Sequence, residues 1–205
     1  MTEDVPSPID LRQMADAKEW ESLAMIRRPW RTEFFAEFTA QLKASERPVS
    51  RVLELGSGPG FLAQQLLTEL RNISYVALDF SPAMHQLVRK RLGALASRVS
   101  FVERSFLDDG WGRDLGQFDC VVTHQAVHEL RHKRRAPRLH AQVKAMLAAG
   151  GMYLMCDHYA GEDGMDNDQL YMTTEEHEAA LVAGGFADVK PVMRKRGLVM
   201  YRCGA

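Results

Sequence analysis

The fold is decided by residues 52–61, which read Val52-Leu53-Glu54-Leu55-Gly56-Ser57-Gly58-Pro59-Gly60-Phe61. The apolar start predicts a buried strand, the glycines predict a tight turn, and Phe61 opens a helical pattern. Glycines let the backbone turn sharply and approach a ligand closely, and the N–H groups at the start of the helix face whatever binds there. The stretch therefore predicts a strand, turn and helix with a ligand at the turn.

An acidic residue ends the next predicted strand. Asp79 lies nineteen residues after Gly60 and closes the β-prone run 73–79. An acid at this place can accept hydrogen bonds from the hydroxyl groups of a ribose. The turn, the helix and this acid together predict a cofactor of the nucleoside type.

Beyond this unit, short β-prone runs alternate with helical stretches. Strands are predicted at 51–55, 73–79, 99–103, 118–123, 152–157, 189–193 and 198–203, and helices at 61–70, 82–95, 137–148 and 175–183. Repeated β–α alternation indicates a parallel sheet covered on both faces, and the last two strands are too close together for a helical crossover. The predicted fold is α/β: a doubly wound, mostly parallel seven-stranded sheet with a C-terminal antiparallel hairpin.

The residues before the first strand predict an N-terminal helical cap. Apolar side chains recur at three- and four-residue spacing over residues 9–44, and Pro29 divides the stretch and suits the first turn of a second helix. We expect one domain over 1–205, with the cap in 1–48 and a cofactor-binding core in 49–205.

Capping residues support the predicted helix boundaries. Ser81 followed by Pro82 fits a helix start, and Thr173 with Glu176 fits a capping box. The pairs Gly150-Gly151 and Gly184-Gly185 are expected where helices end.

Composition excludes several classes of protein. The formal net charge is −1, with 46% hydrophobic and 26% charged residues, so no long-range field would gather nucleic acid or an anionic membrane. No apolar run is long enough to span a bilayer, and the acidic start MTEDVPSPIDLRQ lacks the features of a secretory signal. The cysteines are far apart and form no C-x-x-C pair, which is typical of reduced core thiols: Cys120, Cys156 and Cys203. We expect a cytoplasmic protein; the sequence gives no oligomeric state.

The glycine spacing and one acid discriminate between cofactors. A dinucleotide-binding loop has the pattern G-x-G-x-x-G, whereas this loop is G-x-G-x-G with a proline inside it. Glu54 lies two residues before the first glycine. A carboxylate there would repel a pyrophosphate and favour a ligand with positive charge, such as S-adenosylmethionine. The rival interpretation is an NAD(P)-dependent oxidoreductase.

Four stretches, taken in order, resemble the motifs of class I S-adenosylmethionine-dependent methyltransferases of the small, Rossmann-like kind that acts on small molecules. They are E-L-G-S-G-P-G from residue 54, A-L-D-F-S-P-A-M from 77, F-D-C-V-V-T-H-Q-A-V-H-E-L from 118 and L-A-A-G-G-M-Y-L from 147. The resemblance covers about residues 50–203.

This resemblance implies a set of cofactor-binding residues. The loop that would hold the methionine half of the cofactor consists of Glu54, Gly56, Ser57, Gly58 and Gly60. Asp79 matches the acid that binds the ribose, Phe80 and Met84 match residues flanking the adenine, and His124 and Gln125 follow the fourth strand beside the methionine moiety. The family often has an acid after the third strand. Here Ser105, followed by Phe106, stands in its place, and its hydroxyl can still hydrogen-bond the base.

Methyl transfer is an in-line displacement in which the protein mainly positions the reactants, and a general base is needed only if the acceptor starts protonated. His158, after the fifth strand, is our first candidate for that base, and His128 is the second. The alternative for both is a structural histidine. His124 and His128 are four residues apart beside Glu129, but no third ligand is evident, so no metal is predicted.

Other charged stretches have a functional and a plainer interpretation. Between residues 157 and 174, four acids form either a lid that selects a cationic acceptor or a solvated loop: Glu162, Asp163, Asp166 and Asp168. The basic residues of 131–138 lack interleaved aromatic residues for base stacking and favour a solvated face. Arg27, Arg28 and Arg31 either close over the cofactor or form a surface cluster.

Missing motifs favour a small-molecule acceptor. The sequence after the fourth strand reads Thr123-His124-Gln125-Ala126 rather than the N/D-P-P-Y of enzymes that methylate amino groups of nucleic acids and proteins. Cys120 is not preceded by proline, unlike the nucleophile of cytosine-5 methyltransferases. The predicted function is S-adenosylmethionine-dependent methyl transfer to an O, N or S acceptor; a non-catalytic protein that binds this cofactor is the remaining alternative.

Overall fold

The computed structural model describes residues 4–204, whose contacts divide the chain into two compact units. One unit runs from Pro8 to Ser105. The other consists, within the described residues, of 4–7 and 106–204.

The Pro8–Ser105 unit combines three parallel strands with helices. Its elements are α1 (Met14–Arg27), α2 (Arg31–Lys43), β1 (Arg51–Leu55), α3 (Phe61–Glu69), β2 (Ser74–Asp79), α4 (Pro82–Leu92), the 3₁₀ helix η1 (Gly93–Arg98) and β3 (Val99–Glu103). β2 pairs with β1 on one side and with β3 on the other, with Leu55 opposite Leu78. This register brings the turn after β1 next to the end of β2.

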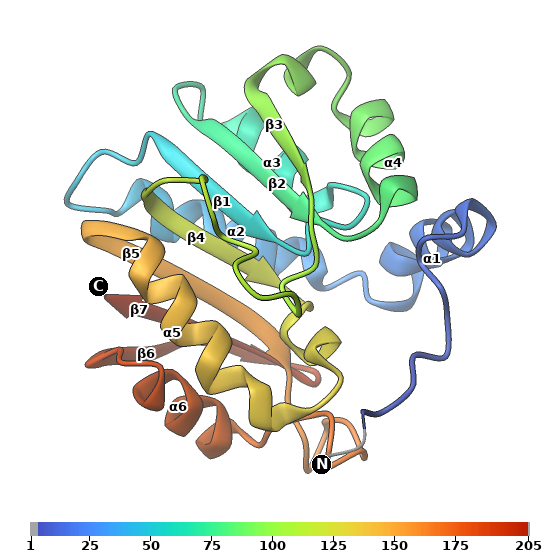
Figure 1. Ribbon diagram of the computed structural model, residues 1–205, viewed down its shortest axis with the longest axis vertical. Helices are drawn as coiled ribbons and strands as arrows, with labels where there is room; N and C mark the ends of the chain where they lie inside the picture. Colours follow the sequence, from blue (N-terminus) through green and yellow to red (C-terminus); the bar gives the residue numbers. More distant parts are fainter. Residues whose placement is uncertain (1–3, 205) are drawn as a thin grey trace. The chain divides into compact units, whose positions relative to one another are not determined.

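The predicted N-terminal helices are present and pack within this unit. α1 lies against α4 (Figure 1), where apolar side chains from both helices form one cluster: Ala17, Ala83, Met84 and Leu87, with Leu11, Met14 and Trp20 beside them. The start of α4 is fixed as expected, because the Ser81 side chain accepts a hydrogen bond from the Met84 N–H and Pro82 follows it.

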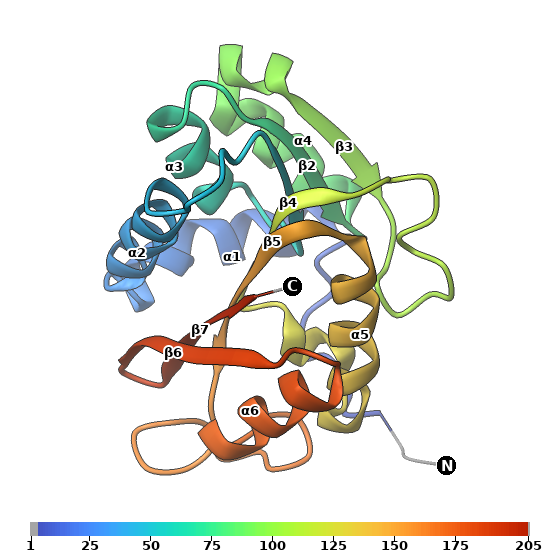
Figure 2. The ribbon, with the colours of Figure 1, turned by 90° about the vertical axis from the view of Figure 1, so that its left-hand side faces the viewer.

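The unit from Phe106 onward contains β4 (Phe118–His124), the 3₁₀ turns η2 (Val127–Leu130) and η3 (Lys133–Arg135), α5 (Ala136–Met146), β5 (Leu147–His158), α6 (Thr174–Ala183), β6 (Asp188–Lys195) and β7 (Leu198–Gly204). β4 and β5 are parallel, whereas β7 runs antiparallel to both β5 and β6. Figure 2 shows β6 and β7 as the predicted closing hairpin. The seven strands follow the order β3-β2-β1-β4-β5-β7-β6, so the α/β, mostly parallel fold is confirmed.

Two local predictions differ from the structure. Gly150-Gly151 does not end a helix: α5 stops at Met146, and the glycines lie inside β5. A Cβ on Gly151 would come within 2.9 Å of the Ala148 carbonyl oxygen, so close approach of backbone explains the residue. Pro29 precedes α2 rather than occupying its first turn, and its carbonyl accepts the Thr32 hydroxyl at 3.0 Å.

Other predictions hold. The capping box of Thr173 and Glu176 begins α6, and Gly184 follows its last residue. All three cysteines are free and buried. Among residues 4–204, no helix is both long and apolar enough to cross a bilayer.

Candidate functional site

The glycine loop joins β1 to α3 in the Pro8–Ser105 unit. Gly56, Gly58 and Gly60 all have positive φ angles, at 68°, 51° and 83°, which a residue with a side chain adopts only at a cost. Gly60 is also packed closely, since a Cβ there would lie 3.0 Å from a methyl group of Val88 on α4. The hydroxyl of Ser57 is buried and has no hydrogen-bond partner among the described residues. The loop thus has the form of a ligand cradle with one unused polar group.

Asp79 fixes this loop to the segment that follows β2. Its Oδ2 accepts the Gly58 N–H at 2.8 Å, and its Oδ1 accepts the Ser81 N–H at 2.9 Å. The side chain is 5% exposed. A carboxylate offers about four acceptor positions, so a group of this kind can also accept hydrogen bonds from the hydroxyls of a sugar.

Glu54 lies beneath the loop at the end of β1. It is 2% exposed, and the Tyr75 hydroxyl donates to its Oε2 at 2.9 Å. Burial raises the pKa of Glu54 to about 8, the Tyr75 hydrogen bond opposes that rise, and the charge of Asp79 adds to it. A cation bound beside this group would favour its ionised form.

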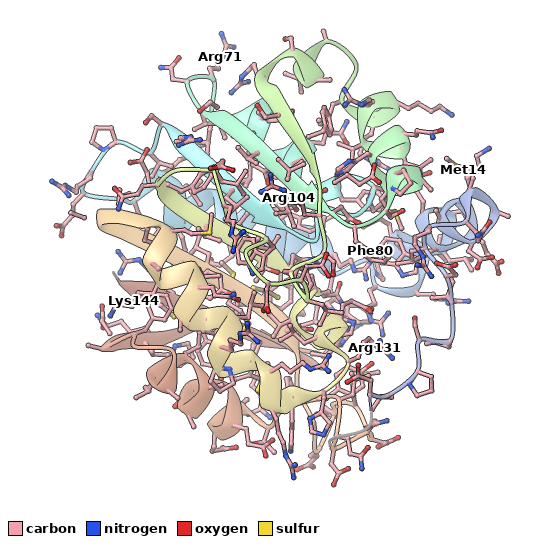
Figure 3. The ribbon with its side chains drawn as sticks, viewed as in Figure 1. Met14, Arg71, Phe80, Arg104, Arg131 and Lys144 are labelled. Atoms are coloured by element: carbon pink, nitrogen blue, oxygen red, sulfur yellow. The ribbon has the colours of Figure 1, made fainter. Side chains whose placement is uncertain are left out.

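The residues matched to the adenine have different surroundings. Phe80, labelled in Figure 3, is 37% exposed and follows Asp79 directly. Met84 is 1% exposed and belongs to the cluster between α1 and α4. Ser105 is half-buried at the end of this unit, and Phe106 begins the other one.

Polar side chains converge where β4 and β5 end in the other unit. We call the group formed by Gln125, His128, Asp157, His158 and Tyr171 the histidine cluster. The centroids of the two histidine rings are 5.4 Å apart, and the Tyr171 ring lies 5.5 Å from His128 and 5.7 Å from His158.

Asp157 organises the histidine cluster from its buried side. Its Oδ1 lies 2.7 Å from Nδ1 of His128, and the same oxygen accepts the His158 backbone N–H at 2.7 Å. Its Oδ2 accepts the His128 backbone N–H at 2.8 Å. Asp157 is 1% exposed, whereas the His128 side chain is 15% exposed. A buried carboxylate therefore holds a partly accessible imidazole.

The electrostatics of this pair favour an ion pair. Burial acts to lower the pKa of His128, but the charge and hydrogen bond of Asp157, together with those of Glu129, outweigh burial, so the pKa is raised well above its ordinary value. Burial likewise acts to raise the pKa of Asp157, and His128 reverses the effect, so that pKa is lowered. Glu129 adds a second carboxylate, 3.4 Å from Nε2 of His128.

His158 has a more enclosed position. It is 6% exposed, and its Nε2 lies 2.6 Å from Nε2 of Gln125. An amide nitrogen only donates, so in this arrangement Nε2 of His158 is the acceptor. Its carbonyl accepts from Nε2 of His177 at 2.9 Å. Gln125, which we expect beside the cofactor, contacts His158 and has a strained φ of 57°.

Asp157 and Tyr171 were missed as functional residues by sequence reasoning. Asp157 is the first charged residue after the apolar run of β5, which was the available signal. Tyr171 reaches the histidine cluster through the connection 159–173, and nothing local in the sequence indicates this. His124, also expected beside the cofactor, is the half-buried last residue of β4.

Basic side chains of residues 131–138 form hydrogen bonds and ion pairs within their own unit. Arg131, labelled in Figure 3, donates to the carbonyls of Val5 and Pro6, and Arg135 pairs with Asp4. Lys133 pairs with Glu176.

The four acids of the 157–174 connection are all exposed. Among the N-terminal arginines, only Arg31 is buried, with its guanidinium 5.2 Å from the Trp20 ring centroid.

Comparison with known proteins finds similarity to methyltransferases. Residues 52–151 match a family model described as a methyltransferase domain. The chain is similar to the release factor glutamine methyltransferase of Deinococcus radiodurans, at 28% identity over 186 residues, which cover 86% of this chain and 60% of that protein.

Solved structures share the fold. An O-methyltransferase family protein from Burkholderia thailandensis matches with a TM-score of 0.73 and 18% identity, over 93% of this chain and 60% of that one. PigF, solved with S-adenosylhomocysteine, matches with a TM-score of 0.74 and 16% identity, over 95% of this chain and 60% of that one. The chain thus spans less than two thirds of the length of each of these relatives.

Proposed function

We propose that the protein, whose residues 52–151 match a family model described as a methyltransferase domain, transfers the methyl group of S-adenosylmethionine to a small-molecule acceptor. The observation that carries the proposal is the glycine loop: three left-handed glycines, the Gly58 N–H held by Asp79, and a buried acid beneath. This arrangement suits a ligand that carries a ribose and a positive charge.

The residues of the loop fit the cofactor. The Asp79 carboxylate is a suitable acceptor for the ribose hydroxyls, and the unused Ser57 hydroxyl offers a polar contact within the cradle. Glu54 provides negative potential for an ammonium group. When bound, S-adenosylmethionine supplies a methyl group on a sulfonium that is already activated for displacement. We also propose contacts with S-adenosylmethionine for the remaining matched residues: Phe80, Met84, Ser105, Phe106, His124 and Gln125.

We propose His128, rather than His158, as the group that takes a proton from the acceptor. Asp157 orients the imidazole through Nδ1, so the atom that takes the proton is Nε2, which lies 3.4 Å from Oε1 of Glu129. His158 is more buried, and its Nε2 is occupied by Gln125. Because the pKa of His128 is raised, the fraction of neutral imidazole is small at pH 7 and grows as the pH rises. We therefore expect turnover to increase with pH above neutrality.

The acceptor class rests on two observations. The solved O-methyltransferase of Burkholderia thailandensis shares the fold of the chain. The Deinococcus relative is described as acting on a release factor, but residues 123–126 of this chain read Thr-His-Gln-Ala and lack the N/D-P-P-Y pattern. We propose an O, N or S nucleophile on a small molecule, in the cytoplasm, rather than nucleic acid or membrane lipid.

A thermal-shift titration tests the cofactor first. A ligand at 100 times its dissociation constant stabilises a protein by about 2.7 kcal/mol, which means a shift of roughly 5–10 °C for a chain of this size. S-adenosylhomocysteine should give this shift and NADH should not. A shift with NADH alone would contradict the proposal.

Turnover is the second step of the same test. S-adenosylhomocysteine formation should be measured with a panel of phenols, carboxylic acids, amines and thiols. His128→Ala should abolish turnover without changing the dissociation constant for S-adenosylhomocysteine. Cofactor binding with no product across the panel would favour a non-catalytic binding protein.

A further inference from the structure

Arg91, in the last turn of α4, contacts three different parts of the Pro8–Ser105 unit. Its Nε donates to the Pro59 carbonyl at 2.8 Å, and its Nη2 donates to Oε1 of Glu21 at 2.6 Å. Its guanidinium carbon lies 3.8 Å from the centroid of the Phe61 ring. The side chain is 20% exposed. One arginine thus joins the glycine loop, the start of α3 and the middle of α1.

The contact with Pro59 fixes the middle of the glycine loop. Pro59 lies between Gly58 and Gly60, which both have left-handed conformations, and glycine itself has little conformational preference. The Gly60 N–H is held by the Ser57 carbonyl at 3.0 Å. Arg91 holds the carbonyl on the other side of the same peptide group. Together the two hydrogen bonds fix the plane of the Pro59–Gly60 peptide, and therefore the direction in which the loop presents its N–H groups.

The contact with Glu21 extends this constraint to α1. A second attachment lies before the helix, where the Ser81 hydroxyl donates to the Leu11 carbonyl at 2.5 Å. The Ser81 N–H is in turn held by Asp79. The stretch from Leu11 to Glu21 is therefore fastened to the segments that follow β1 and β2, and both segments carry proposed cofactor contacts.

We infer that Arg91 is a positioning residue for the cofactor: by holding Pro59 and Glu21 together, it makes docking of α1 and binding of S-adenosylmethionine favour each other. The inference rests on the proposal that the glycine loop holds the cofactor. Coupling of this kind is reciprocal, so ligand binding must stabilise α1 as much as docked α1 strengthens binding. A simple exposed ion pair would contribute little, but this one combines a charge-assisted hydrogen bond, a backbone contact and ring stacking.

The test measures S-adenosylhomocysteine binding by titration calorimetry. Arg91→Met should weaken binding about tenfold, and Arg91→Lys, which retains the charge but not the fork of donors, should weaken it less. Glu21→Gln should weaken binding a few-fold, and the double variant should bind no more weakly than Arg91→Met alone. Lys90→Met is the matched control, since it removes an exposed cation from the neighbouring position and should leave binding within twofold of wild type.

Hydrogen exchange separates positioning from general loss of stability. In the wild-type protein, S-adenosylhomocysteine should slow amide exchange both in residues 56–61 and in α1. In Arg91→Met the slowing should persist in 56–61 and disappear from α1. The inference is overturned if Arg91→Met binds S-adenosylhomocysteine with wild-type affinity. It is also overturned if the ligand does not change the amide-exchange rate of α1 in the wild-type protein. If Arg91→Met does not fold, Arg91→Lys and Glu21→Gln carry the same test. Failure of the wild-type protein to bind S-adenosylhomocysteine would instead remove the proposed function as well.

Discussion

The glycine loop and the histidine cluster are built in opposite ways. The loop takes its shape from neighbouring residues of one stretch, 54–61, whose glycines adopt conformations that other residues avoid. The histidine cluster takes its shape from one buried carboxylate that holds groups about thirty residues away in the chain. A loop shaped by backbone geometry should respond to added side-chain bulk, whereas a cluster shaped by charge should respond to removal of that charge.

Removal of the charge should have the largest effect. Asp157→Ala leaves the partly accessible His128 without its buried carboxylate and deprives two backbone N–H groups of their acceptor, so we expect a loss of about 3 kcal/mol in the free energy of unfolding. Chemical denaturation at pH 6 measures this loss. Asp168→Ala, which removes an exposed acid, should change the free energy of unfolding by less than about 0.5 kcal/mol.

The pH dependence identifies the ion pair as the cause. Since the pKa of His128 is raised, the stability it contributes is complete below its ordinary value of 6.5 and is lost as the pH rises through the raised value. The lowered pKa of Asp157 means that its contribution is complete above 3.8 and is lost as the pH falls. The destabilisation by Asp157→Asn should therefore be greatest between about pH 4 and 6.5 and should shrink at higher pH. A pH-independent loss would mean that hydrogen bonding, not charge, holds the cluster.

Added bulk in the glycine loop should have the next largest effect. Gly60→Ala forces a side chain into φ 83° and brings its Cβ to 3.0 Å from Val88, so we expect a loss of about 2 kcal/mol in S-adenosylhomocysteine binding, which is roughly thirtyfold. Gly58→Ala carries a similar backbone strain, but its Cβ would meet nothing within 4 Å. It should therefore cost less than Gly60→Ala. Equal losses would show that contact with Val88 is unimportant.

The same contrast explains what the sequence could predict. The strand, turn, helix and acid of residues 51–79 were predictable because each depends on local patterns: an apolar run, glycines at fixed spacing, and an acid at a strand end. The caps at Ser81 and Thr173 were predictable for the same reason. Gly150-Gly151 was misinterpreted because a glycine required by close packing of backbone has the same sequence signal as one that ends a helix.

The histidine cluster was only partly predictable. Its histidines were identified as candidates because they follow strand ends, but their ranking depended on contacts across the sheet that sequence spacing does not encode. The Asp157 side chain pairs with the ring of His128 rather than with the ring of the adjacent His158. Gln125 contacts His158, which lies 33 positions further along the chain. The order of preference between His128 and His158 therefore required the structure.

The smallest expected effect concerns the ionisation of Glu54, the acid beneath the glycine loop. The pKa of Glu54 is raised to about 8, so this carboxyl is largely protonated at neutral pH in the free protein. The ammonium group of S-adenosylhomocysteine favours its ionised form, so binding should strengthen between pH 6.5 and 8.5, by less than tenfold overall, with release of a proton. Calorimetry in two buffers of different ionisation enthalpy measures both quantities, and Glu54→Gln should abolish both.

Stability should change in the opposite direction. An acid with a raised pKa ionises more easily in the unfolded chain, so its contribution to the free energy of unfolding falls as the pH rises from 4.5 towards 8. Glu54→Gln should therefore gain stability relative to wild type as the pH rises, while it binds S-adenosylhomocysteine more weakly. A variant that lost both stability and affinity would mean that Glu54 supports the loop through its hydrogen bond with Tyr75 and not through its charge. The loop would then depend on local geometry alone, and charge would matter only in the histidine cluster.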